Sequence, residues 1–95
     1  MRMMLKWSLP TDAGNKMTKD GEVGKLFGAL MEAMKPEAAY WFANGGMRGG
    51  LFVFDLAESS DIPKFAEPLF MAGCSVELHP VMNQEELMKG LAAAA

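Results

Sequence analysis

The chain has 95 residues, of which 51% are hydrophobic and 22% are charged, and its formal net charge at pH 7 is −3. This length accommodates one hydrophobic core, so we expect a single domain over residues 1–95. An acidic chain with only nine Lys and Arg residues lacks the basic surface that binding to nucleic acid requires, which argues against that class of partner.

The first third of the sequence predicts a strand followed by a helix that is broken once. Residues 2–8 predict a strand, which ends before Pro10 because proline cannot continue a β-ladder. Residues 12–35 have a helical pattern, and in their second half the apolar residues recur every three or four positions. We expect a short turn of helix, a break at Asp20 and Gly21, and then the main helix.

A β-hairpin is predicted in the middle of the chain. Residues 38–43 and 51–56 are two runs rich in aromatic and β-forming residues, and a glycine-rich segment separates them. A two-residue Gly-Gly turn beginning at Gly45 suits this hairpin, because both central positions of the favoured turn need a positive φ. The register that this turn sets pairs Trp41 with Gly50.

The last third of the chain predicts a helix, a strand and a short final helix. The first of these begins near Ile62 and stops at Gly73, and Pro68 is expected to bend it or split it in two. Residues 75–80 alternate as a strand, and Asn83 is a cap for the final helix.

This order of elements, βαββαβ with a terminal helix, predicts an α+β fold of the ferredoxin-like type. Right-handed crossovers place the strands in a four-stranded antiparallel sheet, with the spatial order 4-1-3-2 when the strands are numbered along the chain. The same crossovers bring both main helices to one face of the sheet.

The strands of the hairpin are apolar on both faces, whereas a sheet that is covered on one face only alternates apolar and polar residues. Because two helices cover one face, we expect a second copy of the chain to pack on the other, about a two-fold axis. To the helix-covered face we assign Met3, Leu5, Leu51, Val53, Val76 and Leu78. The face between the subunits then carries Met4, Lys6, Trp41, Arg48, Phe52, Phe54, Glu77 and His79. In the alternative, the terminal helix folds over this face within its own chain, docking through Leu87, Met88 and Leu91.

Several short motifs carry a resemblance to a known family, and they are spread over nearly the whole chain. They are Lys35-Pro-Glu-Ala-Ala-Tyr40, Met47-Arg-Gly-Gly50, Glu67-Pro-Leu-Phe70 and Pro80-Val-Met82. With this strand pattern the chain resembles the dimeric α/β-barrel superfamily, which includes muconolactone isomerase and the antibiotic-biosynthesis monooxygenases. Within it the chain is similar to a small bacterial group that has no established reaction. The resemblance implies a homodimer of ferredoxin-like subunits, and a cofactor-independent isomerase or monooxygenase acting on a small aromatic or apolar metabolite. No catalytic residue is implied, because fold does not fix function.

The strongest polar constellation predicted on the subunit-facing side consists of Lys6, Arg48, Glu77 and His79. Glu77 and His79 are two positions apart and therefore point to one face. They are the candidate catalytic residues: the imidazole beside a carboxylate is suited to proton abstraction, and Arg48 or Lys6 to stabilising the resulting oxyanion. The structural alternative is that Lys6 and Glu77 form an ion pair across neighbouring strands while His79 is a hydrogen-bonded strand residue.

We expect no metal and no other cofactor. One His and one Glu fall short of the three or four ligands of a usual metal site, and the methionines are typical of core filler. RNA binding is not supported, since the aromatic residue that an RNA-recognition strand carries directly after Arg-Gly is absent at Gly50 and the first strand lacks the partner motif. No apolar run approaches the about 20 residues of a membrane span. The single cysteine, Cys74, is predicted to be buried and is typical of a cytoplasmic protein.

The sequence therefore predicts a homodimer that binds a small aromatic or apolar molecule, either between the two sheets or between sheet and helices. The predicted binding residues are Trp41, Phe52 and Phe54 as walls, with Lys6 and Arg48 as polar anchors. The alternative is a non-catalytic structural or interaction module, whose sheet face only mediates dimerisation.

Overall fold

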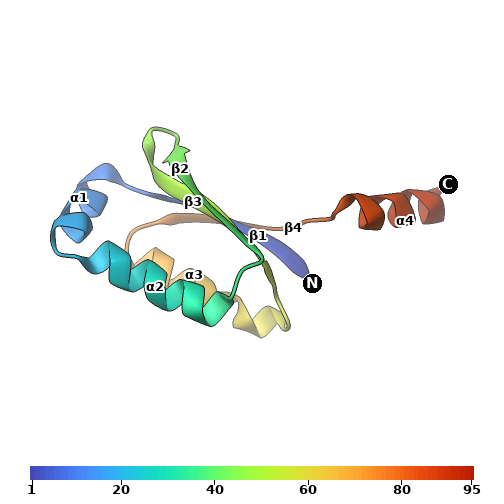
Figure 1. Ribbon diagram of the computed structural model, residues 1–95, viewed down its shortest axis with the longest axis horizontal. Coiled ribbons are helices and arrows are strands. Elements are labelled where there is room, and N and C mark those ends of the chain that lie inside the picture. The colour runs from blue at the N-terminus through green and yellow to red at the C-terminus, as the bar shows by residue number, and fades with distance from the viewer.

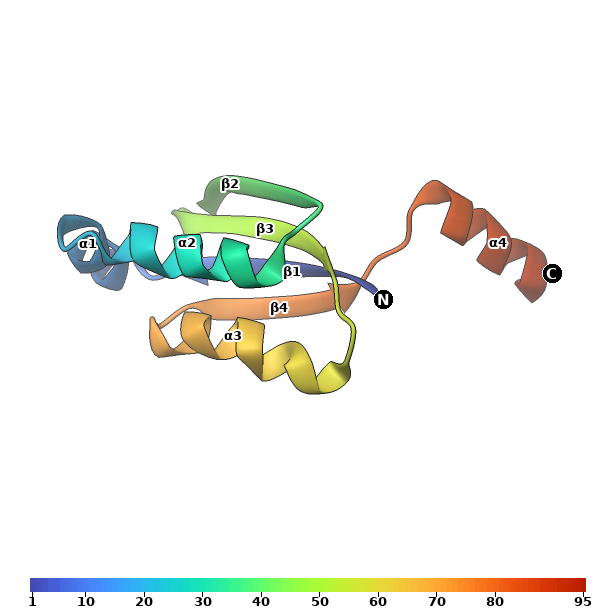
Figure 2. The same ribbon diagram turned by 60° about the horizontal axis from the view of Figure 1, so that its bottom comes forward.

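The computed structural model describes residues 1–95, and its elements are β1 (Arg2–Leu9), α1 (Thr11–Lys19), α2 (Glu22–Met34), β2 (Ala38–Asn44), β3 (Met47–Asp55), the 3-10 turn η1 (Ser59–Asp61), α3 (Ile62–Met71), β4 (Ser75–Pro80) and α4 (Gln84–Ala94). The strands form a four-stranded antiparallel sheet, with α2 and α3 lying along one of its faces and α1 at one end of the sheet (Figures 1 and 2). The strands lie in the order β2-β3-β1-β4. The predicted α+β fold and strand order are therefore confirmed. None of the helices combines the length and the hydropathy needed to cross a membrane.

The turns lie where the glycines predict them. Gly21, with a φ of 76°, separates α1 from α2 at the predicted break, although α1 is longer than the single turn expected. Gly45 and Gly46 have φ values of 62° and 82°, and they form the tight turn between β2 and β3. Gly73 follows α3 with a φ of 93°.

Pro68 does not split α3, which is continuous from Ile62 to Met71. A proline inside a helix removes the hydrogen bond to the carbonyl four residues earlier, here that of Lys64. Pro68 and Lys64 both lie on the exposed side of α3, so this carbonyl is on the side of the helix that faces water. Of the two predicted outcomes at Pro68, a bend or a split, the split does not occur.

The structure corrects the predicted assignment of the two sheet faces. In the pairing of β1 with β3, Leu5 lies opposite Phe52 and Met3 lies opposite Phe54, whereas the sequence interpretation had grouped Met3 and Leu5 with Leu51. Because successive strand residues point to opposite faces, an error of one residue in this register exchanges the faces of the whole hairpin. The helix face carries Met3, Leu5, Trp7, Leu9, Ala39, Trp41, Phe52, Phe54, Val76 and Leu78. The open face carries Met4, Lys6, Tyr40, Phe42, Leu51, Val53, Glu77 and His79.

The core lies between the helix face and the helices α2 and α3. Phe52 and Phe54 are 0% and 1% exposed, so the predicted position of these two residues between subunits was wrong. Helix α2 contributes Phe27, Leu30 and Met34 to this core, and α3 contributes Phe65, Ala66 and Leu69. The aromatic rings of the hairpin thus fill the space beneath the helices of their own subunit.

Helix α4 extends away from the rest of the chain and buries none of its residues (Figures 1 and 2). Its side chains Leu87, Met88 and Leu91 are all exposed, so α4 does not cover the open face of its own subunit. The alternative in which the terminal helix shields that face within the chain is therefore wrong.

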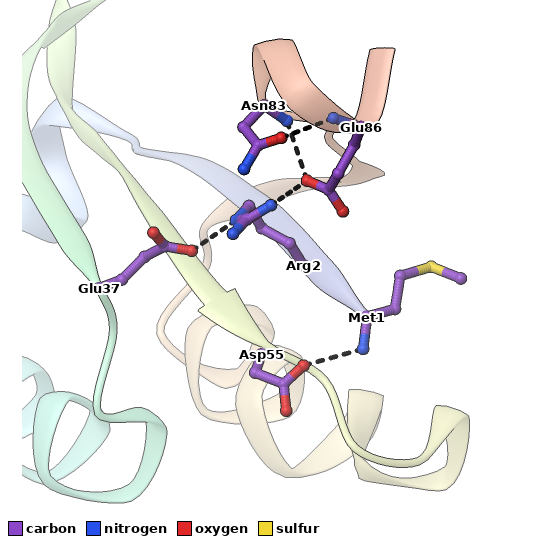
Figure 3. A network of polar contacts seen from close by, with 6 residues as sticks. All are labelled: Met1, Arg2, Glu37, Asp55, Asn83 and Glu86. Atoms are coloured by element: carbon purple, nitrogen blue, oxygen red, sulfur yellow. Dashed lines mark hydrogen bonds and ion pairs between the residues drawn. The ribbon is translucent and has the colours of Figure 1, made fainter. Parts of the chain in front are cut away.

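A polar network fixes the base of α4 (Figure 3). The Asn83 side chain accepts a hydrogen bond from the Glu86 amide at 2.8 Å, and the Asn83 amide donates to the Glu86 carboxylate at 3.0 Å. The second bond, with a further contribution from Arg2, lowers the pKa of Glu86. Arg2 contacts Glu86 and donates to Glu37 Oε1 at 2.7 Å, so it links the first turn of α4 to the residue that precedes β2. Close by, the amino group of Met1 pairs with Asp55.

Gly50 is a position where a side chain has no room. A Cβ atom there would lie 2.6 Å from the Tyr40 carbonyl oxygen and 3.0 Å from Trp7 Nε1. We therefore expect Gly50→Ala to lower the free energy of unfolding by about 1–3 kcal/mol, measured by urea denaturation. Gly28→Ala is the matched control, because a Cβ on this exposed helical glycine meets nothing within 4 Å. It should be neutral or stabilise by up to about 1 kcal/mol. Equal denaturation midpoints for the two variants would contradict the packing described.

Candidate functional site

A cavity of about 410 Å³ opens on the helix-face side of the β2–β3 hairpin, next to the first half of α2. It is called here the aromatic groove, and the residues that define it are Trp7, Phe27, Trp41, Phe42, Met47 and Arg48. The rest of its lining consists of Val23, Ala43, Gly46 and Gly49. A volume of this size lies within the range of about 300–1,000 Å³ that small-molecule sites occupy.

The walls of the groove belong to a tight cluster of rings. Trp7 and Phe27 have ring centroids 4.4 Å apart, and Trp41 stands edge-on to Phe27 at 5.0 Å with an interplanar angle of 88°. Phe52 supports Trp41 from behind at 5.2 Å. The edge-to-face pairs of Trp41 with Phe27 and Phe52 each contribute about 0.5–1.5 kcal/mol beyond the burial of their area, so they hold one side of the Trp41 indole in place.

Trp41 differs from the other rings of the cluster because it remains 52% exposed, whereas Trp7 is 3% exposed. Its position explains this difference: β2 is the edge strand of the sheet, and Phe27 of α2 packs edge-on against one side of Trp41. One side of the Trp41 indole is therefore held against protein while the other faces the groove and solvent.

Arg48 is the only charged residue among those that line the groove. Its Nη1 donates a hydrogen bond to Asn15 Oδ1 at 3.1 Å, and no carboxylate lies within ion-pair distance of it. The guanidinium passes close to Gly14 of α1, where a Cβ would lie 2.8 Å from Nη1. Helix α1 thus orients the Arg48 side chain through a neutral partner, and the positive charge is left without a counterion.

The other predicted polar residues lie on the open face, across the sheet from the groove. His79 Nε2 and Glu77 Oε2 are 3.9 Å apart, and both side chains are more than half exposed. Lys6 is directly opposite Glu77 in the pairing of β1 with β4, as predicted, but no ion pair joins them within the subunit. A smaller, polar hollow of about 180 Å³ lies beside Lys6 and Glu77.

The predicted site residues therefore separate into three places. Trp41 and Arg48 meet in the aromatic groove, and Lys6, Glu77 and His79 lie on the open face. Phe52 and Phe54 are in the core, where Phe52 backs Trp41 and Phe54 packs on Phe65.

The groove residues that the sequence interpretation missed are Trp7, Phe27 and Phe42. A signal for Trp7 was present, because Gly50 lies opposite it and leaves room for an indole. Phe27 had been predicted only as part of the apolar stripe of the main helix, and Phe42 as one of the hairpin aromatics.

No group of three or more His, Cys, Asp and Glu side chains is arranged to hold a metal ion. Comparison of the chain with protein-family models, with curated proteins and with solved structures gives no match. The chemistry that the groove supports therefore follows from its own residues.

Cys74 lies in the core, and the environment of its thiol disfavours ionisation. Burial raises the pKa of Cys74 to about 11, so the unreactive thiol form predominates near neutral pH. We expect the native protein to react with a thiol-specific disulfide reagent at pH 8 at least about tenfold more slowly than the protein unfolded in urea, because reaction requires the thiolate. Equal rates in the two states would contradict the burial of this residue.

Proposed function

We propose that the protein binds a small aromatic or apolar molecule in the aromatic groove. The observation that carries this proposal is a cavity of about 410 Å³ whose wall includes a tryptophan, Trp41, that is half exposed although its neighbours are buried. A planar ligand that stacks on this indole removes apolar surface from water on both partners. Burial of that surface contributes about 25 cal/mol per Å², and an aromatic pair contributes about 0.5–1.5 kcal/mol more.

The groove supports binding rather than a proton-transfer reaction. Its lining contains no Asp, Glu, His, Cys or Tyr, and a guanidinium is not suited to act as a general base. The pair formed by Glu77 and His79 lies on the open face, so an isomerase or monooxygenase reaction of the kind that the family resemblance implies would take its acid–base groups from that face. We therefore propose a binding function and assign no reaction to the groove.

We propose further that two copies of the chain associate through their open faces. Tyr40 is 64% exposed, and the register places it beside Leu51 and Val53 on the face that no helix of the same subunit covers (Figure 2). Lys6 and Glu77 flank these apolar residues with opposite charges, which suits a two-fold contact of the face with itself. The arrangement matches the sheet-to-sheet pairing implied by the family resemblance. A protein in which this face only mediates dimerisation is the competing function, and the binding test below separates the two.

The binding test uses 2-naphthol, a neutral two-ring probe, in titration calorimetry with the wild-type chain. We expect Trp41→Ala to weaken its binding by about tenfold or more, because the stacking wall is lost. Tyr40→Ala is the matched control: it removes the neighbouring, more exposed aromatic residue, which points to the open face, and should leave the affinity unchanged. Equal losses in the two variants, or no binding to the wild type, would overturn the proposed site.

The association test measures molar mass in solution by light scattering at micromolar concentration. We expect the wild-type chain to have twice the mass of one chain, and Leu51→Glu to have the mass of one, because a charge would be buried in the contact. Met71→Glu is the control, since Met71 is 85% exposed at the end of α3 and far from the open face. A wild-type chain that is monomeric, or a Leu51→Glu variant that remains dimeric, would show that the open face is not the interface.

A further inference from the structure

The charge of Arg48 sets the aromatic groove apart from an ordinary apolar hollow. Seven of the ten lining residues are hydrophobic, and Arg48 is the only one that carries a charge. Its only side-chain hydrogen bond goes to the amide oxygen of Asn15, which orients the guanidinium without neutralising it. A guanidinium has five N–H donors. Asn15 accepts from one of them, so the others can donate hydrogen bonds to a ligand.

We propose that the ligand of the groove is a planar aromatic carboxylate, with its ring against Trp41 and its carboxylate on Arg48. This inference rests on the proposed function and names the chemical class of the ligand. The carboxylate is planar and accepts two parallel hydrogen bonds, which is the geometry that the fork of an arginine presents. The ring supplies the flat apolar surface that matches the indole.

The position of Arg48 favours one negative charge at one end of the ligand. It lies on the β3 side of the hairpin, opposite Ala43 in the register, so it is close to the strand that carries Trp41. The indole Nε1 of Trp7 is fully buried, so it cannot donate a hydrogen bond to a ligand. Arg48 is the one charged side chain that lines the groove, and it is therefore the anchor for a charged group. A phosphate ester is a poorer match, because a dianion is usually bound by several donors or by more than one cation.

The net negative charge of the protein means that an anion is attracted to Arg48 locally and not to the surface as a whole. A chain with a net charge of −3 does not attract anions in general, so binding of an anion depends on the local charge of Arg48. Arg48 is itself exposed to solvent, so its selectivity for a carboxylate rests on the paired hydrogen bonds of its guanidinium rather than on exclusion of water.

The test compares 2-naphthoate with 2-naphthamide, which have the same rings and differ in the charge of the substituent. By titration calorimetry we expect the wild-type chain to bind naphthoate about tenfold to hundredfold more tightly, the range typical of a hydrogen-bonded charge pair. Arg48→Gln should bring the two affinities together by weakening naphthoate alone. Lys89→Gln removes a cation from the exposed helix α4, which does not line the groove, so it should preserve the preference.

Two additional variants keep the test decisive if Arg48→Gln folds poorly. Asn15→Ala leaves the charge in place but removes the bond that orients it, and it should reduce the preference severalfold. Arg48→Lys keeps the charge without the fork and should give an intermediate preference. A preference for naphthoate that survives Arg48→Gln would overturn the role of Arg48. Equal binding of both probes to the wild type would overturn the carboxylate class and leave the proposed binding function standing, whereas failure of both probes would overturn the binding function itself.

Discussion

The packing of the Trp7 indole against the backbone of Gly50 decides how the rest of the molecule is arranged. The two residues lie opposite each other in the central pair of strands, and Gly50 leaves the space that the indole occupies. From this position the ring contacts Phe27 of α2 and approaches Trp41 of β2. One contact thus connects the helix layer, the central strands and the edge strand, and it fixes which side of each strand faces the helices.

The consequences of that register extend to both surfaces of the sheet. With Trp7 turned toward the helices, Phe52 and Phe54 follow it into the core, and the open face is left with Tyr40, Phe42 and smaller aliphatic residues. The groove then forms at the hairpin end of the helix face, where the edge strand β2 extends beyond the cover of α2 and leaves Trp41 half exposed.

The elements and their order were predictable because local signals mark them. Gly21, Gly45 and Gly73 stand at positions of positive φ, and each ends an element where the pattern indicates. The sheet faces were not predictable from hydrophobicity, since the set with Phe52 and the set with Leu51 are both apolar and alternate along the same strand. The helix face is marked by Gly50, which pairs with both Trp7 and Trp41 and leaves the space that these two indoles occupy.

The part of the candidate site that lies on the hairpin was predictable from the sequence, and the part that the helices contribute was not. The hairpin register follows from its glycine turn, so the pairing of Trp41 with Gly50 and the shared face of Trp41 and Arg48 were accessible from the sequence. The neighbours of these two residues depend on how α1 and α2 cross the sheet. Contacts of that kind, such as Asn15 with Arg48 and Phe27 with Trp41, join residues far apart in the chain, and no local pattern indicates them.

The hairpin places two surfaces of different character on alternate residues of the same strands. Tyr40 belongs to one surface and Trp41, the next residue, belongs to the other. Each surface can therefore diverge by substitution while its counterpart stays as it is. Insertion or deletion of a single residue within β2 or β3 has a different effect, because it exchanges the two surfaces beyond that point. Length variation among descendants of this chain should consequently be confined to the turn and to the segments outside the strands.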